Sequence, residues 1–197
     1  MVAQKLLAQG KPVVAMIRNT DQQSYFTELG AEVVIADLEG DFRHAFTGCE
    51  KVVFTAGSGP KTGADKTLLV DLWAASRSVD YAKTFNIRQF VMVSARGAAD
   101  PDLGPVSIKP YNVAKRFADQ YLLDSGIPCT ILRPGRLLNE QATHRFTTLR
   151  PAEPENQVIT REDTADAIVY CLNHPSTIGE VAELYQGELP LSAVLTV

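Results

Sequence analysis

Cysteine is scarce in this sequence, and its three copies form no pair typical of a redox or metal site. Cys49, Cys129 and Cys171 lie far apart among apolar residues, so no Cys-x-x-Cys spacing occurs. The histidines His44, His144 and His174 have no acidic or thiol neighbour at ligand spacing, and we predict no metal site. We therefore expect buried, reduced thiols and a cytoplasmic protein.

An excess of positive charge is also absent. Lys and Arg number 19 against 23 Asp and Glu, which gives a net charge of -4 and a pI near 5.4, and the basic residues are scattered. This argues against a nucleic-acid surface. No apolar run reaches the roughly 18 residues of a membrane span, and no basic region precedes an apolar run as in a secretory signal. A small-molecule substrate is the partner that we expect.

Short apolar runs alternate with segments of helical period, which indicates an α/β fold with a parallel sheet covered on both faces. The runs are rich in Val and Ile and do not alternate with polar residues, as expected of strands buried on both faces. We predict strands at 12–17, 32–36, 51–56, 89–94, 129–133 and 181–186. With 197 residues, the pattern predicts a single Rossmann-like, doubly wound domain over residues 1–197.

The predicted helices lie between these strands, at 21–29, 41–46, 65–85, 111–124 and 160–173. The longest has an apolar stripe that starts at Leu68 and Leu72. Thr160 and Asp163 have the spacing of a capping box. Two long loops, 97–110 and 136–158, follow the carboxyl ends of strands, where open α/β sheets bind ligands.

Three signals follow one another along the chain: Ser94 at the end of VMVSA, Tyr111-x-x-x-Lys115, and Pro134 with Gly135 after the strand CTILR. Residues four apart share one face of a helix, so Tyr111 and Lys115 are expected one turn apart. Such an arrangement can hold a substrate carbonyl, donate a proton to it and fix a nicotinamide ring beside it. The Tyr-x-x-x-Lys spacing is weak evidence alone, and the ordered trio is stronger.

These stretches resemble the atypical short-chain dehydrogenase/reductase superfamily, in particular its compact, sugar-epimerase-like or NmrA-like NAD(P)-binding group. The resemblance runs from about residue 2 to residue 190 and is most specific in FVMVSARGA, YNVAKRFAD, ILRPG and ITREDTADAI. It implies that Tyr111 is the general acid/base, that Lys115 lowers the pKa of this phenol and binds the nicotinamide ribose, and that Ser94 orients the substrate carbonyl. The alternative is that Tyr111 and Lys115 are a solvated pair on the helix and that Ser94 is an ordinary serine at the end of a strand.

The same resemblance implies a set of cofactor contacts. Arg18 ends the strand after which NADP sites place an arginine for the 2′-phosphate, so we expect NADP(H), with NAD as the alternative cofactor. A surface arginine at a strand end is the other interpretation. Asp37 and Leu38 resemble the pair that contacts adenine, although a turn carboxylate fits Asp37 nearly as well. Further contacts are implied for Ala56, Gly57 and Pro134, the last one against the nicotinamide.

A first strand and a G-x-G-x-x-G loop are missing before the first predicted strand. In a Rossmann sheet that first strand lies between the strands predicted at 12–17 and 51–56, and its loss would leave both without a hydrogen-bonding neighbour. We therefore expect the native protein to begin upstream of Met1, and the chain as printed to bind a dinucleotide weakly. Closure of the sheet, or a neighbouring chain in the slot, is the alternative.

The leading functional hypothesis is an NADP(H)-dependent oxidoreductase of the atypical short-chain class that acts on a small carbonyl or alcohol. A non-catalytic dinucleotide sensor of the NmrA-like kind is the second hypothesis, and a flavin-reductase-like enzyme is the third. A homodimer is the assembly that we expect for this fold. The intact Tyr111 and Lys115 favour the enzyme over the sensor, whereas the missing glycine loop favours the sensor.

Overall fold

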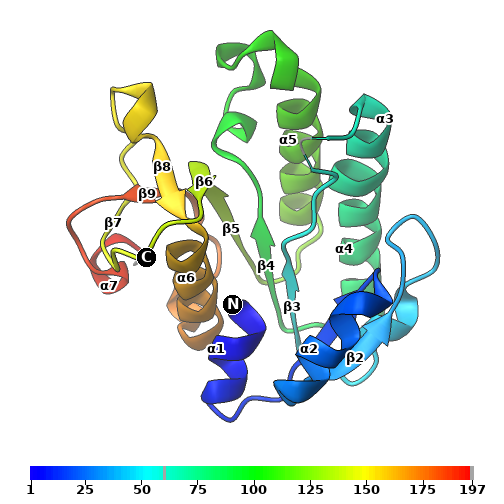
Figure 1. Ribbon diagram of the computed structural model, residues 1–197. Helices are drawn as coiled ribbons and strands as arrows, with labels where there is room; N and C mark the ends of the chain where they lie inside the picture. Colours follow the sequence, from blue (N-terminus) through cyan, green and yellow to red (C-terminus); the bar gives the residue numbers. More distant parts are fainter. Residues whose placement is uncertain (60, 196–197) are drawn as a thin grey trace.

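The computed structural model describes residues 1–59 and 61–195, with a sheet between two layers of helices (Figure 1). Four parallel strands form the centre in the order β3 (Lys51–Phe54), β4 (Gln89–Val93), β5 (Cys129–Pro134) and β9 (Val181–Gln186). The short strand β7 (Phe146–Thr147) pairs antiparallel with β9. The predicted Rossmann-like α/β fold with a parallel sheet is thereby confirmed.

Two parallel pairs of strands lie outside the central sheet. The pair β1 (Val14–Ile17) and β2 (Glu32–Ile35) is parallel and forms a sheet of its own. Val14 pairs with Glu32 in β2, and Val53 of β3 pairs with Val91 in β4. Across residues 1–59 and 61–195, no ladder joins β1 to β3. The sheet therefore does not close up between these two strands.

Burial follows this division of the sheet. Most residues of β4 and β5 are buried, as predicted for strands covered on both faces. The prediction is wrong for β2, which has no buried residue, and only partly right for β1 and β3. A strand without a neighbour on one side keeps that edge open to solvent, which explains their partial exposure.

Each face of the central sheet has its own apolar core. On one face, Phe90 and Ile131 pack with α4 (Ala75–Thr84) and α5 (Lys109–Asp124). On the other face, Val91 and Leu132 pack with α6 (Arg161–Asn173), α1 (Val2–Ala8) and α7 (Leu191–Val194). Alternate residues of β4 and β5 thus supply the two cores, because successive strand side chains point to opposite faces.

The remaining predicted helices differ in detail from the expectation. Helix α2 (Gln23–Glu28) forms within 21–29, whereas 41–46 contains only a 3₁₀ turn, Arg43–Phe46. The segment 136–158, predicted as a loop, contains β7 and the parallel pair β6 (Arg136–Leu138) and β8 (Val158–Thr160). These strands have only two or three residues, too few for a recognisable hydrophobic period.

The long helix at 64–84 is not uniformly α-helical. The α-helical turn α3 (Ala64–Lys66) continues into the π-helical segment η3 (Thr67–Ala74) and then into α4. Hydrogen bonds in a π-helix span five residues, so its buried face differs from that of an α-helix. Leu68, predicted on the buried stripe, is 56% exposed, and Asp71 is fully buried instead. The predicted stripe is therefore wrong at its first turn.

The three cysteines are free, with Cys129 and Cys171 buried and Cys49 half-buried. Burial raises the pKa of the Cys171 thiol to about 12. Among the helices in the described part of the chain, none combines the length and the apolar character that crossing a bilayer requires.

We predict that Thr160 contributes measurably to stability through α6. Its side chain accepts a hydrogen bond from the Asp163 backbone N–H at 2.9 Å, which confirms this half of the predicted capping box. Replacing Thr160 by Ala should lower the free energy of unfolding by about 0.5–2 kcal/mol. Urea unfolding measures the change, with the exposed Ser24→Ala in α2 as a control. Equal stability of both variants and the wild type would contradict the assignment.

Candidate functional site

Helix α5 brings the predicted Tyr and Lys together at the carboxyl edge of the sheet. The helix begins with Lys109 and Pro110, and proline is well tolerated in a first helical turn. Tyr111 therefore lies at the start of the helix and Lys115 one turn later. The Lys115 ammonium lies 5.7 Å from the centre of the Tyr111 ring, close enough for a cation–π contact.

The Lys115 ammonium is buried and surrounded by oxygen atoms. The side chain is 3% exposed, and its Nζ lies 3.2 Å from Oδ1 of Asp71, which is itself fully buried. Nζ also donates to the backbone carbonyls of Ala56, at 3.3 Å, and Val93, at 3.4 Å. Lys115 thus contacts the chain just beyond β3, the end of β4 and the helix η3 at once.

The protonation of Tyr111 differs from the expectation. The sequence predicts that Lys115 lowers the pKa of the phenol. In the structure the pKa of Tyr111 is raised to about 12, mainly by burial and further by the negative charges of Asp71 and Asp119. Asp71 pairs with the lysine, so the ammonium is compensated before it can act on the phenol. Tyr111 is consequently protonated and uncharged at neutral pH.

Ser94 follows β4 directly and has a buried hydroxyl group. The residue is 4% exposed, and its Oγ has no partner with hydrogen-bonding geometry among the described residues. Nearby, Arg133 of β5 donates from Nε to Oδ2 of the buried Asp119 at 2.9 Å. Burial raises the pKa of Asp119, while Ser94 and Arg133 act in the opposite direction. An unpaired buried hydroxyl is unusual and indicates a place for a ligand or a water molecule.

Pro134 and Gly135 lie at the end of β5. Pro134 is buried and is paired with Leu184 of β9. Gly135 is closely surrounded, because an added Cβ would lie 2.5 Å from the Gln157 carbonyl oxygen. This turn therefore fits against β8 and β9 only with glycine, and it lies at the same sheet edge as Ser94.

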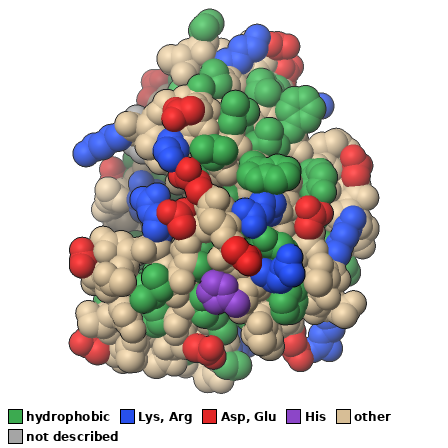
Figure 2. Space-filling view, turned by 90° about the vertical axis from the view of Figure 1, so that its right-hand side faces the viewer, with side chains coloured by type: hydrophobic (Ala, Val, Ile, Leu, Met, Phe, Trp, Pro, Cys, Tyr) green, Lys and Arg blue, Asp and Glu red, His purple; other side chains and the backbone are tan. Residues whose placement is uncertain are grey.

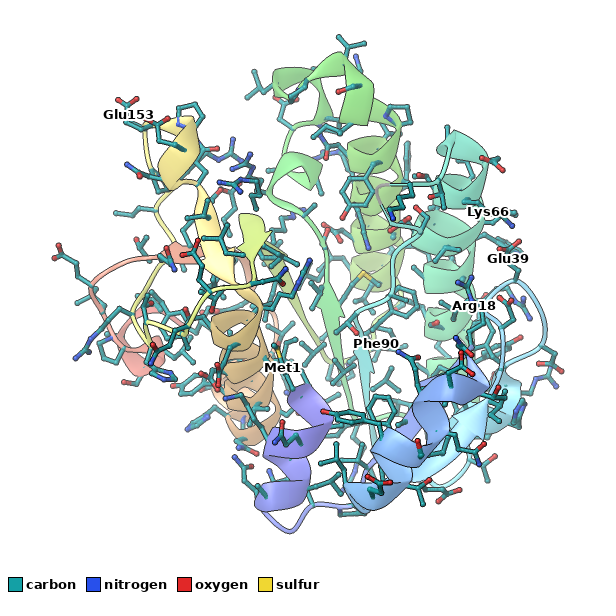
Figure 3. The ribbon with its side chains drawn as sticks, in the orientation of Figure 1. Met1, Arg18, Glu39, Lys66, Phe90 and Glu153 are labelled. Atoms are coloured by element: carbon teal, nitrogen blue, oxygen red, sulfur yellow. The ribbon has the colours of Figure 1, made fainter. Side chains whose placement is uncertain are left out.

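The predicted adenosine contacts lie farther along this edge. Arg18 follows β1 and is exposed, and no ion pair of its guanidinium occurs within residues 1–59 and 61–195. Figure 3 shows it on the same side of the molecule as Glu39 and Lys66, which form an ion pair at 2.7 Å. Asp37 accepts a hydrogen bond from the Glu39 backbone N–H at 2.9 Å. It is therefore a turn carboxylate, which was the alternative interpretation of this residue from the sequence.

Leu38 and Ala56 are partly buried and pack against the apolar core between the sheet and α4. This packing holds the turn to which each residue belongs. Gly57 is exposed, and a Cβ at this position would lie 3.0 Å from Asp71 Oδ1. The backbone N–H of Ser58 donates to the other Asp71 oxygen, Oδ2, at 3.0 Å. The turn at 56–58 is thus in direct contact with Asp71.

Asp71 is the member of this site that sequence reasoning missed. In an α-helix it would lie three residues from Leu68, inside a run that looks like an ordinary amphipathic helix. Asp71 lies three residues after Leu68 and four before Ala75, so it falls on the predicted apolar stripe, and its carboxylate pairs with Lys115. It belongs to the π-helical segment η3. Such segments occur often at functional sites, but neither the hydrophobic period nor a capping pattern of the sequence predicts this one.

An apolar groove of about 420 Å³ lies beside the start of α5. Its walls come from α3 and η3 on one side and from the segment before and within α5 on the other: Ala64, Leu68, Val106, Lys109, Pro110 and Val113. Pro110 directly precedes Tyr111, so the groove lies beside the first turn of α5, although Tyr111 itself is not among its lining residues.

His144 departs from its expected lack of acidic partners. Its Nδ1 lies 3.0 Å from Asp166 Oδ2, and Asp163 is within reach of the same group. The Asp163 carboxylate already accepts hydrogen bonds from the backbone of Thr143 and His144 and from Thr160 Oγ1. Lys5 further pairs with Asp166 at 2.7 Å. These hydrogen bonds and ion pairs join α1, α6 and the loop around His144, so the cluster has a structural explanation.

Comparison with known proteins agrees with this geometry. Residues 1–175 match the family model described as NAD(P)H-binding. The chain belongs to this family. Its relatives and structural neighbours place it in the atypical short-chain dehydrogenase/reductase group that the sequence resembles.

Several relatives are similar over most of the chain. The "uncharacterized sugar epimerase YhfK" of Bacillus subtilis is 39% identical over 184 residues, which cover 92% of this chain and 85% of that protein. A solved structure, a "putative NAD-dependent epimerase/dehydratase" from Bacillus halodurans, has a TM-score of 0.92 and is 43% identical in sequence. The match covers 98% of this chain and 91% of that chain. Sanguinarine reductase of Eschscholzia californica is 35% identical over 109 residues, 52% of this chain and 40% of that enzyme.

The chain is therefore a member of an NAD(P)-binding family of oxidoreductase-like and epimerase-like proteins. Its residues fit the nicotinamide half of such a cofactor, with a buried ammonium at Lys115, an unpaired Ser94 hydroxyl and the narrow turn at Gly135. Arg18 is exposed where a ribose phosphate would need a cation. The printed sequence contains no G-x-G-x-x-G loop for the pyrophosphate.

Proposed function

We propose that this protein is an NADP(H)-dependent reductase of small carbonyl compounds, with Tyr111 as the proton donor. The observation that carries the proposal is Tyr111 beside the buried Lys115 ammonium at the carboxyl edge of the sheet. Its pKa, raised to about 12, keeps Tyr111 in the protonated form, from which it can give a proton to a carbonyl oxygen.

In this proposal each residue has a separate task. A bound nicotinamide dinucleotide would supply a hydride to the carbonyl carbon of the substrate. Tyr111 donates its phenolic proton to the carbonyl oxygen, which yields the alcohol, and the phenolate then regains a proton from solvent. Lys115 binds ribose hydroxyl groups, and Ser94 offers its unpaired hydroxyl to the carbonyl. The apolar groove beside Pro110 suits a substrate with an apolar body.

Two other functions remain as competing proposals. A dinucleotide sensor would bind the cofactor without turnover. A flavin-reductase-like enzyme would pass hydride to a bound ring with no need for a phenol. One relative is named sanguinarine reductase, and this name supports the proposal of a reductase activity, without indicating the substrate. Free cysteines suit a reducing compartment, and we propose the cytoplasm.

Replacing Tyr111 by Phe separates these functions. Loss of the proton donor should lower kcat for NADPH-dependent carbonyl reduction by about 10²–10⁴-fold, while NADPH affinity changes little. Stopped-flow or steady-state assays with aldehydes, ketones and a free flavin measure both quantities. Flavin reduction that survives the substitution would favour the third function. Binding without turnover of any substrate in the wild type would favour the sensor.

Replacing Arg18 by Ala tests the choice of cofactor. A charge-assisted contact between the guanidinium and the 2′-phosphate contributes about 1.5–3 kcal/mol, so its loss should reduce NADPH affinity by about 10–150-fold and leave NADH affinity nearly unchanged. Fluorescence titration with both dinucleotides gives the ratio. Arg43→Ala, at the exposed 3₁₀ turn, is the control for a general loss of positive charge. An unchanged NADPH/NADH ratio would refute the role of Arg18.

We also propose that the protein pairs with a second copy through one helical face. Helices η3 and α5 expose Leu69, Trp73, Phe117 and Tyr121 by 40–60% each, and Figure 2 shows apolar side chains gathered over the upper part of this side of the molecule. A patch of several large apolar groups is rare on a monomer surface.

Light scattering should therefore give the mass of a dimer for the wild type. Phe117→Glu should give a monomer, because a charge would have to be buried at the interface. Leu149→Glu, which changes an equally exposed leucine in a separate loop, should leave the dimer intact. A monomeric wild type at high protein concentration would contradict the proposed pairing.

A further inference from the structure

The carboxylate of Asp71 is fully buried and faces two parts of the site at once. Its Oδ1 lies 3.2 Å from the Lys115 ammonium, and its Oδ2 accepts the Ser58 backbone N–H at 3.0 Å. A carboxylate without solvent is costly unless it is paired and hydrogen-bonded, so these contacts are what make its burial tolerable. No packing requirement calls for an acid at this position, since an apolar side chain would fill the same space more cheaply.

The two contacts connect segments that the cofactor must touch together. Lys115 is the proposed ribose ligand, while the turn at 56–58 follows β3 at the carboxyl edge of the sheet, where open α/β sheets bind ligands. The turn lies against the acid itself, because a Cβ on Gly57 would approach Oδ1 to 3.0 Å. A movement of Asp71 would therefore move the turn and release the ammonium.

The helix that carries Asp71 is distorted where the acid lies. The π-helical segment Thr67–Ala74 interrupts an otherwise α-helical stretch and buries Thr67, Val70, Asp71 and Ala74 on one face. Π-helical hydrogen bonding is less favourable than α-helical bonding, and proteins retain it mainly where it orients a functional side chain. Thr67 supports the same arrangement, with its Oγ1 3.4 Å from Ser58 Oγ.

We propose that Asp71 is the positioning residue of this site, which holds the Lys115 ammonium and the turn at 56–58 in their binding geometry through one buried carboxylate. The effect of Asp71 on catalysis rests on the proposed function. The positioning role itself concerns only Asp71, Lys115 and the turn. Asp71 touches neither substrate nor cofactor, and acts on both through its two partners.

A second consequence concerns Tyr111. The charged groups around the phenol are Asp71 from η3, Lys115 and Asp119 from α5, and Arg133 of β5, which is paired with Asp119. Because the negative charge of Asp71 raises the pKa of Tyr111, its removal should lower that pKa. A proton donor loses activity as the pH rises through its pKa, so the alkaline limb of the reduction should move to lower pH.

Two variants separate the two contacts. Asp71→Asn removes the charge and keeps an oxygen for the Ser58 N–H, whereas Asp71→Ala removes both contacts. Asp163→Asn is the matched control, because Asp163 is also fully buried, and its carboxylate accepts hydrogen bonds from Thr143, His144 and Thr160 in another part of the structure. All three should lose stability in urea unfolding, so stability alone does not decide the question.

The first readout needs no cofactor. Acylation of lysines with an amine-directed reagent, followed by mass spectrometry, reports the accessibility of each amine. Lys115 should be strongly protected in the wild type and in Asp163→Asn, and labelled at least about tenfold faster in Asp71→Asn and Asp71→Ala, because the ammonium loses its buried partner. Equal labelling of Lys115 in all four proteins would overturn the proposal.

The second readout uses NADPH titration and the pH profile of kcat. Asp71→Asn should weaken NADPH binding by about tenfold or more and move the alkaline limb down by about one pH unit, and Asp71→Ala should weaken binding further. Asp163→Asn should change neither quantity. A wild type that binds no dinucleotide, with Lys115 labelling as expected, would refute the proposed function alone. Unchanged binding and pH profile in Asp71→Asn would leave Asp71 a purely structural residue and overturn the proposal.

Discussion

The arrangement of the site depends on one buried ion pair, between Lys115 and Asp71. Two charges in a protein interior are stable only when each is paired and the remaining donors and acceptors are satisfied. The carbonyls of Ala56 and Val93 meet this condition for the ammonium. The Ser58 N–H satisfies Oδ2 of the carboxylate, whereas Oδ1 has the ionic contact with Lys115 and no hydrogen bond among the described residues. Consequently α5, η3 and the segments after β3 and β4 are held at fixed mutual positions.

The same ion pair determines the chemistry available to Tyr111. A free ammonium next to a phenol would favour the phenolate, whereas a compensated ammonium leaves burial and two carboxylates to raise the pKa of Tyr111 to about 12. The site is therefore suited to proton donation. The apolar groove lies at the start of α5, and Arg18 is exposed after β1.

Much of the fold could be predicted because hydrophobic runs and helical periods are local signals. All six predicted strands form, and α5 and α6 begin within two residues of their predicted starts. The order Ser94, Tyr111, Lys115 and Pro134 predicted one shared edge of the sheet, and the structure has these residues there. Asp71 was missed although it falls on the predicted stripe, because its partner Lys115 lies far along the chain and their pairing depends on tertiary contacts. The compensation of Lys115, and the resulting pKa of Tyr111, were missed for the same reason.

In the described part of the chain β1 pairs with β2 and β3 pairs with β4, and no ladder joins β1 to β3. A crystal structure with NADPH bound would test the central claim most directly. The account predicts a ribose hydroxyl within hydrogen-bonding distance of Lys115 Nζ, the nicotinamide between Tyr111 and Pro134, and Asp71 still paired with the lysine. A dinucleotide on another face of the molecule, or no bound dinucleotide at saturating concentration, would contradict it.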